Sequence, residues 1–472
     1  MNKQVSPQAA VAEAANVAET FARFAHDLDV GAIPDRVVQR AKLHILDASG
    51  IGLASTTYDF AQHAANGIAA LAGEGDCPVI GMSLRLPIRD AVHLNGVLVH
   101  GLDFDDTHSG AVTHLTASIW PTVLAVAHRE SASGAEALTA YLAGVECGAR
   151  IGAAAQGGFH TKGFHPTGVV GTFASTIAAG WLMDLSETQL RQAQGIALSM
   201  ASGSLEFLAD GAGTKRMHPG WAGACAITAA AMAKQGFTGP AAPYEGRYGL
   251  FSSYMPDDAS VDLAGIGATL GEAWEMENVA FKPFPACHLA HACIDAALAL
   301  KREHGFGVDD IEAIVARVGA GPVPVICEPE AEKRRPTTAY EAQFSVHYMI
   351  AAALRRGRFT LAELDAEALN DPSIQALAAK VSYEVNPDSA YPRYYDGEVD
   401  IRFADGRMLK HLEAKNRGSD GNPLTADDIV DKFLGNATRA VSRRRAERVR
   451  AAVIALDTAL DLDDLADALS LA

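Results

Sequence analysis

The sequence predicts a mainly α protein, in which a large all-helical domain carries an inserted smaller α+β domain. Through most of residues 8–236 and again through 425–472, apolar residues recur at spacings of three and four, as on helices that bury one face. Between these regions, short stretches alternate apolar and polar residues as strands do. The predicted boundaries are 1–277 and 413–472 for the helical domain and 278–412 for the α+β domain.

The elements of the first domain follow in chain order. Residues 8–72 are expected to form Ala-rich amphipathic helices, with Pro34 near the start of one, where proline is tolerated. Residues 77–81 form a short strand or an extended connection. Helices resume at Ile88 and continue with breaks to about residue 236, and a capping box of Ser186 and Gln189 opens one of them. Residues 237–281, rich in Gly and Pro, form a long connection.

The inserted domain shows a different pattern. A helix is expected near 290–304, followed by a strand over 311–318, where apolar residues alternate. Residues 399–403 and 408–414 flank an Ala-Asp-Gly-Arg turn and are expected to form a β-hairpin. Helix returns over 425–472, so the C-terminal helices should rejoin the first domain.

Composition excludes several classes of protein. The chain has 472 residues, 49% of them hydrophobic and 20% charged, as in an ordinary globular protein. Its net charge of −18 and the absence of a basic stripe argue against a nucleic-acid partner. The six cysteines are scattered without a CxxC pair, which argues against a zinc ribbon or a disulfide framework. No signal peptide or apolar run of membrane-spanning length is recognised, so we expect a cytoplasmic protein without a membrane partner.

The stretch from His100 to His114 concentrates carboxylates and imidazoles behind an apolar run: His-Gly-Leu-Asp-Phe-Asp-Asp-Thr-His-Ser-Gly-Ala-Val-Thr-His. Unpaired charges lose their hydration on burial, so such a stretch needs partners. If the preceding helix continues, His100, Asp103 and Thr107 lie on one face, and the residues around Ser109 let the chain bring His114 back. The alternative is a polar helix end with capping aspartates.

Three later stretches carry the same chemistry. Residues 163–168, Gly-Phe-His-Pro-Thr-Gly, form a turn that exposes His165 just before a helix, where backbone N–H groups bind carboxylates; His160 reads as a surface loop residue. Residues 211–221 contain Gly-Thr-Lys without the spacing of a phosphate-binding loop, and Lys215 and His218 there suit an anion clamp. Residues 282–291, at the proposed domain boundary, carry Lys282 and two histidines that can face one cleft, His288 and His291.

Together these groups suit proton transfer at a carbon next to a carboxylate, with cations holding the carboxylates of a small-molecule acid and stabilising a developing enediolate. We expect His114 and His165 to act as the acid/base pair, because histidine titrates near neutrality. Asp103 would orient one imidazole, and His288 is the reserve candidate. The alternative is that His114 and His165 only bind carboxylates.

The residues also resemble a known family. Leu-Asp-Phe-Asp-Asp-Thr, Phe-His-Pro-Thr, Thr-Lys-Arg-Met-His-Pro-Gly-Trp, Lys-Pro-Phe-Pro-Ala-Cys-His and the Asn-Pro-Leu-Thr-x-x-Asp-x-x-x-Lys-Phe of 422–433 occur in this order. The set is similar to the MmgE/PrpD family over nearly the whole chain. That family includes 2-methylcitrate dehydratase, cis-aconitate decarboxylase and iminodisuccinate epimerase.

The resemblance implies a homodimer with a cofactor-free, metal-free site between the helical domain and an α+β lid. It also implies a lyase for a di- or tricarboxylic acid, first a 2-methylcitrate dehydratase-like hydro-lyase, with an epimerase or a decarboxylase of the iminodisuccinate or cis-aconitate type as alternatives. His108 directly follows Thr107, so His108 or His114 could fill the family's histidine position. The residues carried over to this site are Asp103, Thr107, His114, His165, Lys215, Lys282 and His288.

Other classes fit less well. The helical first half and Asp105-Asp106 suit an isoprenoid synthase, whose aspartates hold magnesium diphosphate, but the third aspartate of that motif is replaced by Ser109. A DDxxD string in the C-terminal tail reads as a solvated helix face: Asp463, Asp464 and Asp467. A metal hydrolase could use His160, His165, His288 and His291, although no HExxH spacing occurs. A helical scaffold would not need four stretches that carry histidine.

Overall fold

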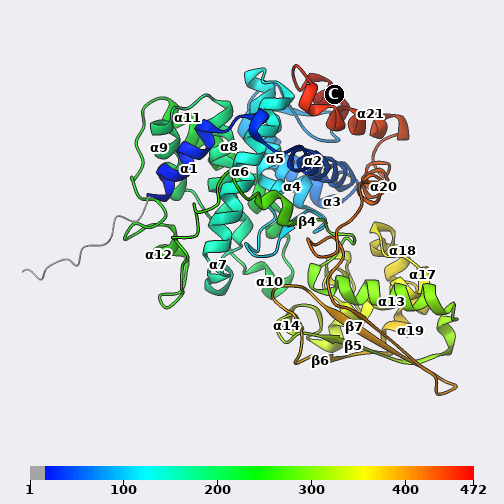
Figure 1. Cartoon of the computed structure of the whole chain (residues 1–472). Helices are drawn as coiled ribbons and strands as arrows, with labels where there is room; N and C mark the ends of the chain where they lie inside the picture. Colours follow the sequence, from blue (N-terminus) through cyan, green and yellow to red (C-terminus); the bar gives the residue numbers. More distant parts are fainter. Residues whose placement is uncertain (1–15, 472) are drawn as a thin grey trace, which may run out of the picture.

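The computed structural model describes residues 16–471 and is mainly helical, with the helical mass on one side and a small sheet on the other (Figure 1). Residues 8–15 of the first expected helical region and Ala472, the last residue of the expected C-terminal helical region, lie outside the described part. The helices before residue 255 are α1 (Val17–Asp27), α2 (Asp35–Ser55), α3 (Asp59–Ala69), α4 (Ile88–His100), α5 (Thr116–Glu130), α6 (Gly134–Ala154), α7 (Gly158–Lys162), α8 (Pro166–Leu182), α9 (Glu187–Leu198), α10 (Phe207–Asp210), α11 (His218–Lys234) and α12 (Leu250–Tyr254).

Helix α8 is the centre of the first core, because it is apolar all round and all its residues except Trp181 are buried. It packs against α5, α6, α9 and α11. Helices α4 and α11 approach closely, because each presents a glycine to the other. A Cβ atom on Gly96 would lie 2.3 Å from the Cα atom of Gly220. The Ser186–Gln189 capping box at the start of α9 is confirmed.

The second core belongs to a mixed four-stranded sheet and its helices. Its strand order is β6 (Val381–Val385), β5 (Ile311–Val318), β7 (Gly397–Phe403) and β8 (Met408–Glu413), with β5 and β6 parallel and the other pairs antiparallel. Strand β5 and the β7–β8 hairpin lie where the sequence predicts them; β6 was not predicted. The helices are α13 (His291–His304), α14 (Val323–Ile326), α15 (Glu330–Lys333), α16 (Ala339–Ala342), α17 (Val346–Arg356), α18 (Ala366–Leu369) and α19 (Pro372–Ala378).

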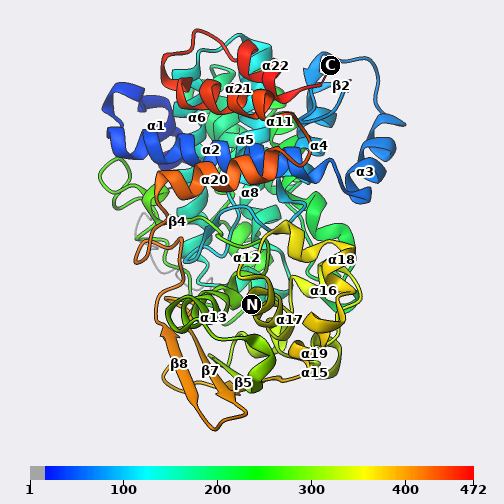
Figure 2. The same cartoon turned by 90° about the vertical axis from the view of Figure 1, so that its right-hand side faces the viewer.

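Strands β5–β8 and helices α13–α19 form a second body, and two features join it to the helical body. Helices α20 (Ala426–Ala437) and α21 (Arg443–Ile454) return to pack on α2, and α22 (Asp463–Leu469) packs on α21, far from the sheet (Figure 2). The long connection over 237–281 ends in β4 (Val279–Ala280), which pairs antiparallel with β3 (Thr107–His108). This ladder brings Lys282 beside the acidic stretch. A separate two-stranded ladder joins β1 (Cys77–Pro78) and β2 (Arg85–Leu86).

None of the helices within residues 16–471 combines the length and the apolar character that crossing a membrane requires.

Candidate active site

The acidic stretch does not continue helix α4. The helix ends at His100, Asp103 has a φ of 51°, and Thr107 already belongs to strand β3. The expected single helical face of His100, Asp103 and Thr107 is therefore wrong, because a left-handed residue cannot continue a right-handed helix. The turn instead folds the stretch back over the end of α4.

Asp103 is held by the two lysines that the sequence singles out. Lys215 Nζ lies 2.7 Å and Lys282 Nζ 2.9 Å from its Oδ1 atom, and Lys282 also donates to its backbone carbonyl at 2.9 Å. Burial opposes ionisation of Asp103, but the two ammonium groups outweigh it and hold its pKa well below the usual range. Two cations share one carboxylate here, so one positive charge remains to attract an anionic substrate.

Four imidazoles gather beside this ion pair. The ring centroid of His100 lies 5.0 Å from that of His114 and 5.6 Å from that of His165, and His165 lies 5.2 Å from His218. His165 precedes α8 as expected, but it is buried rather than exposed, because this cluster and the Phe207 ring at 6.0 Å cover it. Its Nδ1 atom lies 3.0 Å from His218 Nδ1, so one imidazole donates to the other.

The tautomer of His114 follows from its hydrogen bond. Its Nδ1 atom lies 2.6 Å from the backbone carbonyl oxygen of Asp106, which can only accept. Nδ1 therefore carries the proton, and Nε2 keeps its lone pair. Burial lowers the pKa of His114 to about 3, so the ring is neutral at pH 7. A neutral imidazole with a free lone pair suits a general base.

His108 has different surroundings from His114. Its Nε2 atom lies 2.9 Å from Glu275 Oε2, and its Nδ1 atom accepts the backbone N–H of Ala111. Nε2 therefore carries the proton and donates to the carboxylate. Both ring nitrogens of His108 are engaged outside the histidine cluster, whereas His114 lies within it, so the geometry favours His114 as the candidate site residue.

His288 and His291 come from the start of the second body, in a short 3-10 turn and at the first residue of α13. His288 Nε2 lies 2.9 Å from the Asn416 side-chain nitrogen, and His291 Nε2 donates to the carbonyl of Ala286 at 3.0 Å. Within the described residues, the Nδ1 atoms of both rings have no hydrogen-bond partner. Burial, assisted by Lys282, lowers the pKa of His288 to about 3.

Several polar groups beside the candidate site were not among the residues predicted from the sequence. Asp105 Oδ2 lies 2.7 Å from His100 Nδ1, and Asp106 accepts from the backbone and side chain of Thr116. Lys432, from the C-terminal motif, binds Asp47 at 2.8 Å behind the acidic stretch. Asp105 could have been found by its spacing, because it stands two residues after Asp103 in the same motif.

The metal-based interpretations gain no support from this arrangement. Asp105 and Asp106 have different partners, and no group of three or more His, Cys, Asp or Glu side chains within residues 16–471 is placed to hold a metal ion. His160 lies on α7 and is exposed.

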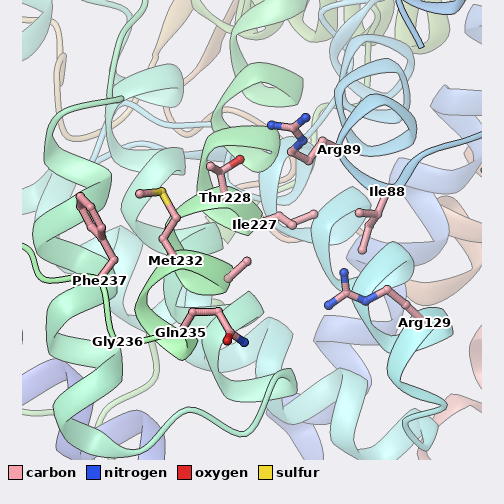
Figure 3. A pocket seen from close by; sticks show the side chains of 10 residues that line it. Ile88, Arg89, Arg129, Ile227, Thr228, Met232, Gln235, Gly236 and Phe237 are labelled. Atoms are coloured by element: carbon pink, nitrogen blue, oxygen red, sulfur yellow. The ribbon is translucent and has the colours of Figure 1, made fainter. Parts of the chain in front are cut away.

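Two hollows lie outside this cluster. One of about 680 Å³ opens between α4, α5 and α11 (Figure 3) and contains none of the site residues; it is lined by Ile88, Arg89, Arg129, Ile227, Thr228, Ala231, Met232, Gln235, Gly236 and Phe237. A smaller one of about 200 Å³ lies beside the β3–β4 ladder, between His108 and the second body's Arg393. The second hollow is the one that adjoins the acidic stretch.

Comparison with known proteins identifies the family. The MmgE/PrpD N-terminal domain model matches residues 19–262, and the C-terminal domain model matches 284–458. The chain belongs to the MmgE/PrpD family. It is 31% identical to human cis-aconitate decarboxylase, over 90% of this chain and 89% of that protein.

Two other relatives align over comparable lengths. The chain is 28% identical to a cis-aconitate decarboxylase-like protein of Aspergillus oryzae, over 95% and 96% of the two chains. It is 25% identical to mitochondrial 2-methylcitrate dehydratase of Yarrowia lipolytica, over 96% and 89%. Both relatives match the MmgE/PrpD chain along almost its whole length.

Proposed function

We propose that this MmgE/PrpD protein is a cofactor-independent lyase that decarboxylates cis-aconitate or a closely similar tricarboxylate. The relatives named cis-aconitate decarboxylase support this choice, because they match at 31% and 28% identity over at least 90% of the chain. The dehydratase activity that the sequence motifs favoured becomes the second candidate, supported by the 25% match to 2-methylcitrate dehydratase.

The observation that carries the proposal is the pairing of surplus positive charge with neutral imidazoles. Lys215 and Lys282 share the single carboxylate of Asp103, so a substrate carboxylate can bind against the remaining charge. His114 and His165 lie within 6.3 Å of each other, measured between ring centroids. Either ring can then exchange a proton with a carbon atom of the bound acid.

The chemistry can be followed through these groups. When a carbon–carboxylate bond breaks, carbon dioxide leaves, and the electron pair is delocalised toward a neighbouring carboxylate held by Lys215. The proton that replaces carbon dioxide on carbon comes from the Nε2 atom of His114, which first takes that proton up from solvent, because the ring is neutral in the free protein. Dehydration uses the same parts in another order, with one imidazole removing a proton from carbon and a second protonating the leaving hydroxyl.

Incubation with cis-aconitate, 2-methylcitrate and iminodisuccinate in deuterated water, followed by NMR, tests the proposal. We expect loss of carbon dioxide from cis-aconitate and one deuterium on carbon in the product, with the same rate after exhaustive chelation. Dehydration of 2-methylcitrate without decarboxylation would favour the second candidate. Loss of turnover on chelation, restored by magnesium or zinc, would overturn the cofactor-independent proposal.

The homodimer, the lid role of the second body and a cytoplasmic location belong to the same proposal. The homodimer and the lid role rest on the family resemblance, and the lid role rests also on the position of the candidate site residues, which come from both bodies. Light scattering coupled to size exclusion measures the oligomeric state directly, and a monomer at micromolar concentration would contradict the dimer.

A further inference from the structure

One buried carboxylate–imidazole contact in the histidine cluster has no part in the function described so far. His100 is the last residue of α4, and Asp105 stands five residues further along the turn. His100 Nδ1 lies 2.7 Å from Asp105 Oδ2, and both side chains are fully buried. Burying a charged carboxylate costs free energy unless the carboxylate is paired. The carboxylate of Asp105 therefore depends on its contact with His100.

The pair lies directly behind the proposed base. Asp105 Oδ2 is 3.9 Å from His114 Nδ1, the ring nitrogen that donates to the Asp106 carbonyl. The His100 ring is 5.0 Å from the ring of His114 and stacks on that of His165 at 5.6 Å. Within residues 16–471, His100 Nε2 and Asp105 Oδ1 have no hydrogen-bond partner, and both are buried.

Resting on the proposed function, we propose that Asp105 and His100 are positioning residues for proton transfer at His114. Asp105 stabilises the positive charge that His114 carries whenever its Nε2 holds a second proton. His100 fixes Asp105 in place by donating from Nδ1. The proton moves only between the substrate carbon and His114 Nε2, while His114 Nδ1–H stays on the carbonyl of Asp106.

The charges around His114 show why Asp105 is the effective anion. Asp103 is neutralised by Lys215 and Lys282, and the pKa of Asp106 is raised to about 8 by burial and by Asp105, so Asp106 is largely protonated at pH 7. Against His114, burial, both lysines and His100 lower the pKa, while Asp105 raises it. The other groups that face this pair are His165, His288, Lys432 and Asp47.

A purely structural role is the competing explanation, because the contact also fixes the end of α4 to the turn. The two explanations differ in their kinetics. A positioning role predicts that Asp105→Asn lowers kcat on the order of 100-fold with KM little changed, since substrate carboxylates bind elsewhere. Because His114 must be protonated to deliver its proton to carbon, it also predicts that the alkaline limb of kcat moves to lower pH, and that Asp105→Glu partly restores kcat.

Glu275→Gln is the matched control, because it alters a second imidazole–carboxylate contact, with His108 at 2.9 Å, outside the cluster. It should leave kcat and its pH profile unchanged. If folded Asp105→Asn keeps wild-type kcat and pH profile, the proposal is wrong, whatever its melting temperature. If Asp105→Asn does not fold, His100→Gln takes its place, and an unchanged kcat in that variant also overturns the proposal.

The failure of the proposed function would look different. If wild-type protein turns over none of the carboxylic acids, histidine NMR titration still tests the electrostatic relationship in the folded protein. Asp105→Asn should then lower the pKa of His114 relative to wild type, while Glu275→Gln should not. An unchanged His114 titration would overturn the inference independently of any substrate.

Discussion

Lys282 donates from one ammonium group to both the side chain and the backbone carbonyl of Asp103, each at 2.9 Å. This double contact holds Asp103 in its left-handed conformation, with a φ of 51°, and turns the acidic stretch back toward α4. Lys215 binds the same carboxylate oxygen at 2.7 Å but has a partly exposed side chain. The two lysines are therefore expected to differ in their roles, although the sequence motifs treat them alike.

Lys282→Met should lower the free energy of unfolding by about 3 kcal/mol, because removing one partner of a buried ion pair leaves a poorly compensated carboxylate. Urea denaturation measures the loss. Lys282 is thus expected to stabilise the fold as well as to serve the carboxylate-binding role that the sequence predicts. A variant as stable as wild type would show that Lys215 alone satisfies Asp103.

Lys215→Met should instead act mainly on binding. A charge-assisted hydrogen bond is worth roughly 1.5–3 kcal/mol, so KM for the tricarboxylate should rise by about 10- to 150-fold. Lys162→Met, at the exposed end of α7, is the control and should leave KM unchanged. Wild-type KM in the Lys215 variant would remove this lysine from the substrate site.

Gly220→Ala should destabilise the protein on the order of 3 kcal/mol, because the added Cβ would lie 2.0 Å from the carbonyl oxygen of His93. The contact sets the spacing of α4 and α11, which carry His100 and His218, so activity should fall as well. Gly67→Ala on α3 is the control: its Cβ would meet nothing within 4 Å, and alanine there should stabilise by about 0.5–1 kcal/mol. Thermal and urea denaturation report both changes.

Asp106→Asn should become progressively more stable than wild type between about pH 4 and pH 8. Burial and Asp105 raise the pKa of Asp106 to about 8, whereas an unfolded aspartate titrates near 4. The stability that protonated Asp106 contributes is complete below the pKa of the unfolded state. It is lost as the pH rises from that pKa through the pKa of the folded state, by up to about 1.4 kcal/mol per pH unit. Asparagine keeps the Thr116 contacts without titrating. A stability difference that does not vary with pH would show that Asp106 is ionised in the folded protein.

The parts of the fold that could be predicted are those with a clear period. Strand Ile311–Val318 was predicted from its alternation, and its burial alternates from Ile314 to Val318, after a register shift between Ile311 and Ala313. Strand Val381–Val385 escaped prediction because it is a short edge strand that is buried only at its first residue. The motifs likewise singled out lysines and histidines that the structure brings close together, because such groups need partners once they are buried.

The partners themselves could not be predicted, since they depend on contacts between distant parts of the chain. Asp103 was expected to orient an imidazole, but the turn at φ 51° directs it to the lysines, and Asp105 makes the carboxylate–imidazole contact instead. The choice between His108 and His114 depends on Glu275, which is 167 residues away from His108 in the chain. No local pattern in the sequence encodes that distance.

The last prediction separates the two candidate acid/base residues. His114 has its tautomer fixed by the Asp106 carbonyl and a free Nε2, whereas His165 shares a proton with His218. We therefore expect His114→Gln to abolish deuterium exchange at the substrate carbon while substrate still binds. His165→Gln should retain part of the exchange, because the Nδ1 atom of His165 contacts His218 and His114 is the group that transfers the proton at carbon.

NMR of substrate in deuterated water measures exchange, and isothermal titration measures binding in the same variants. His108→Gln is the control, because its ring contacts Glu275 outside the cluster. Loss of exchange in that variant, with exchange kept in His114→Gln, would reassign the base to His108. Wild-type exchange in both the His114 and the His165 variants would mean that these imidazoles only bind carboxylates, and the proton transfer would then have to be sought at His288, whose Nδ1 atom has no hydrogen-bond partner among the described residues.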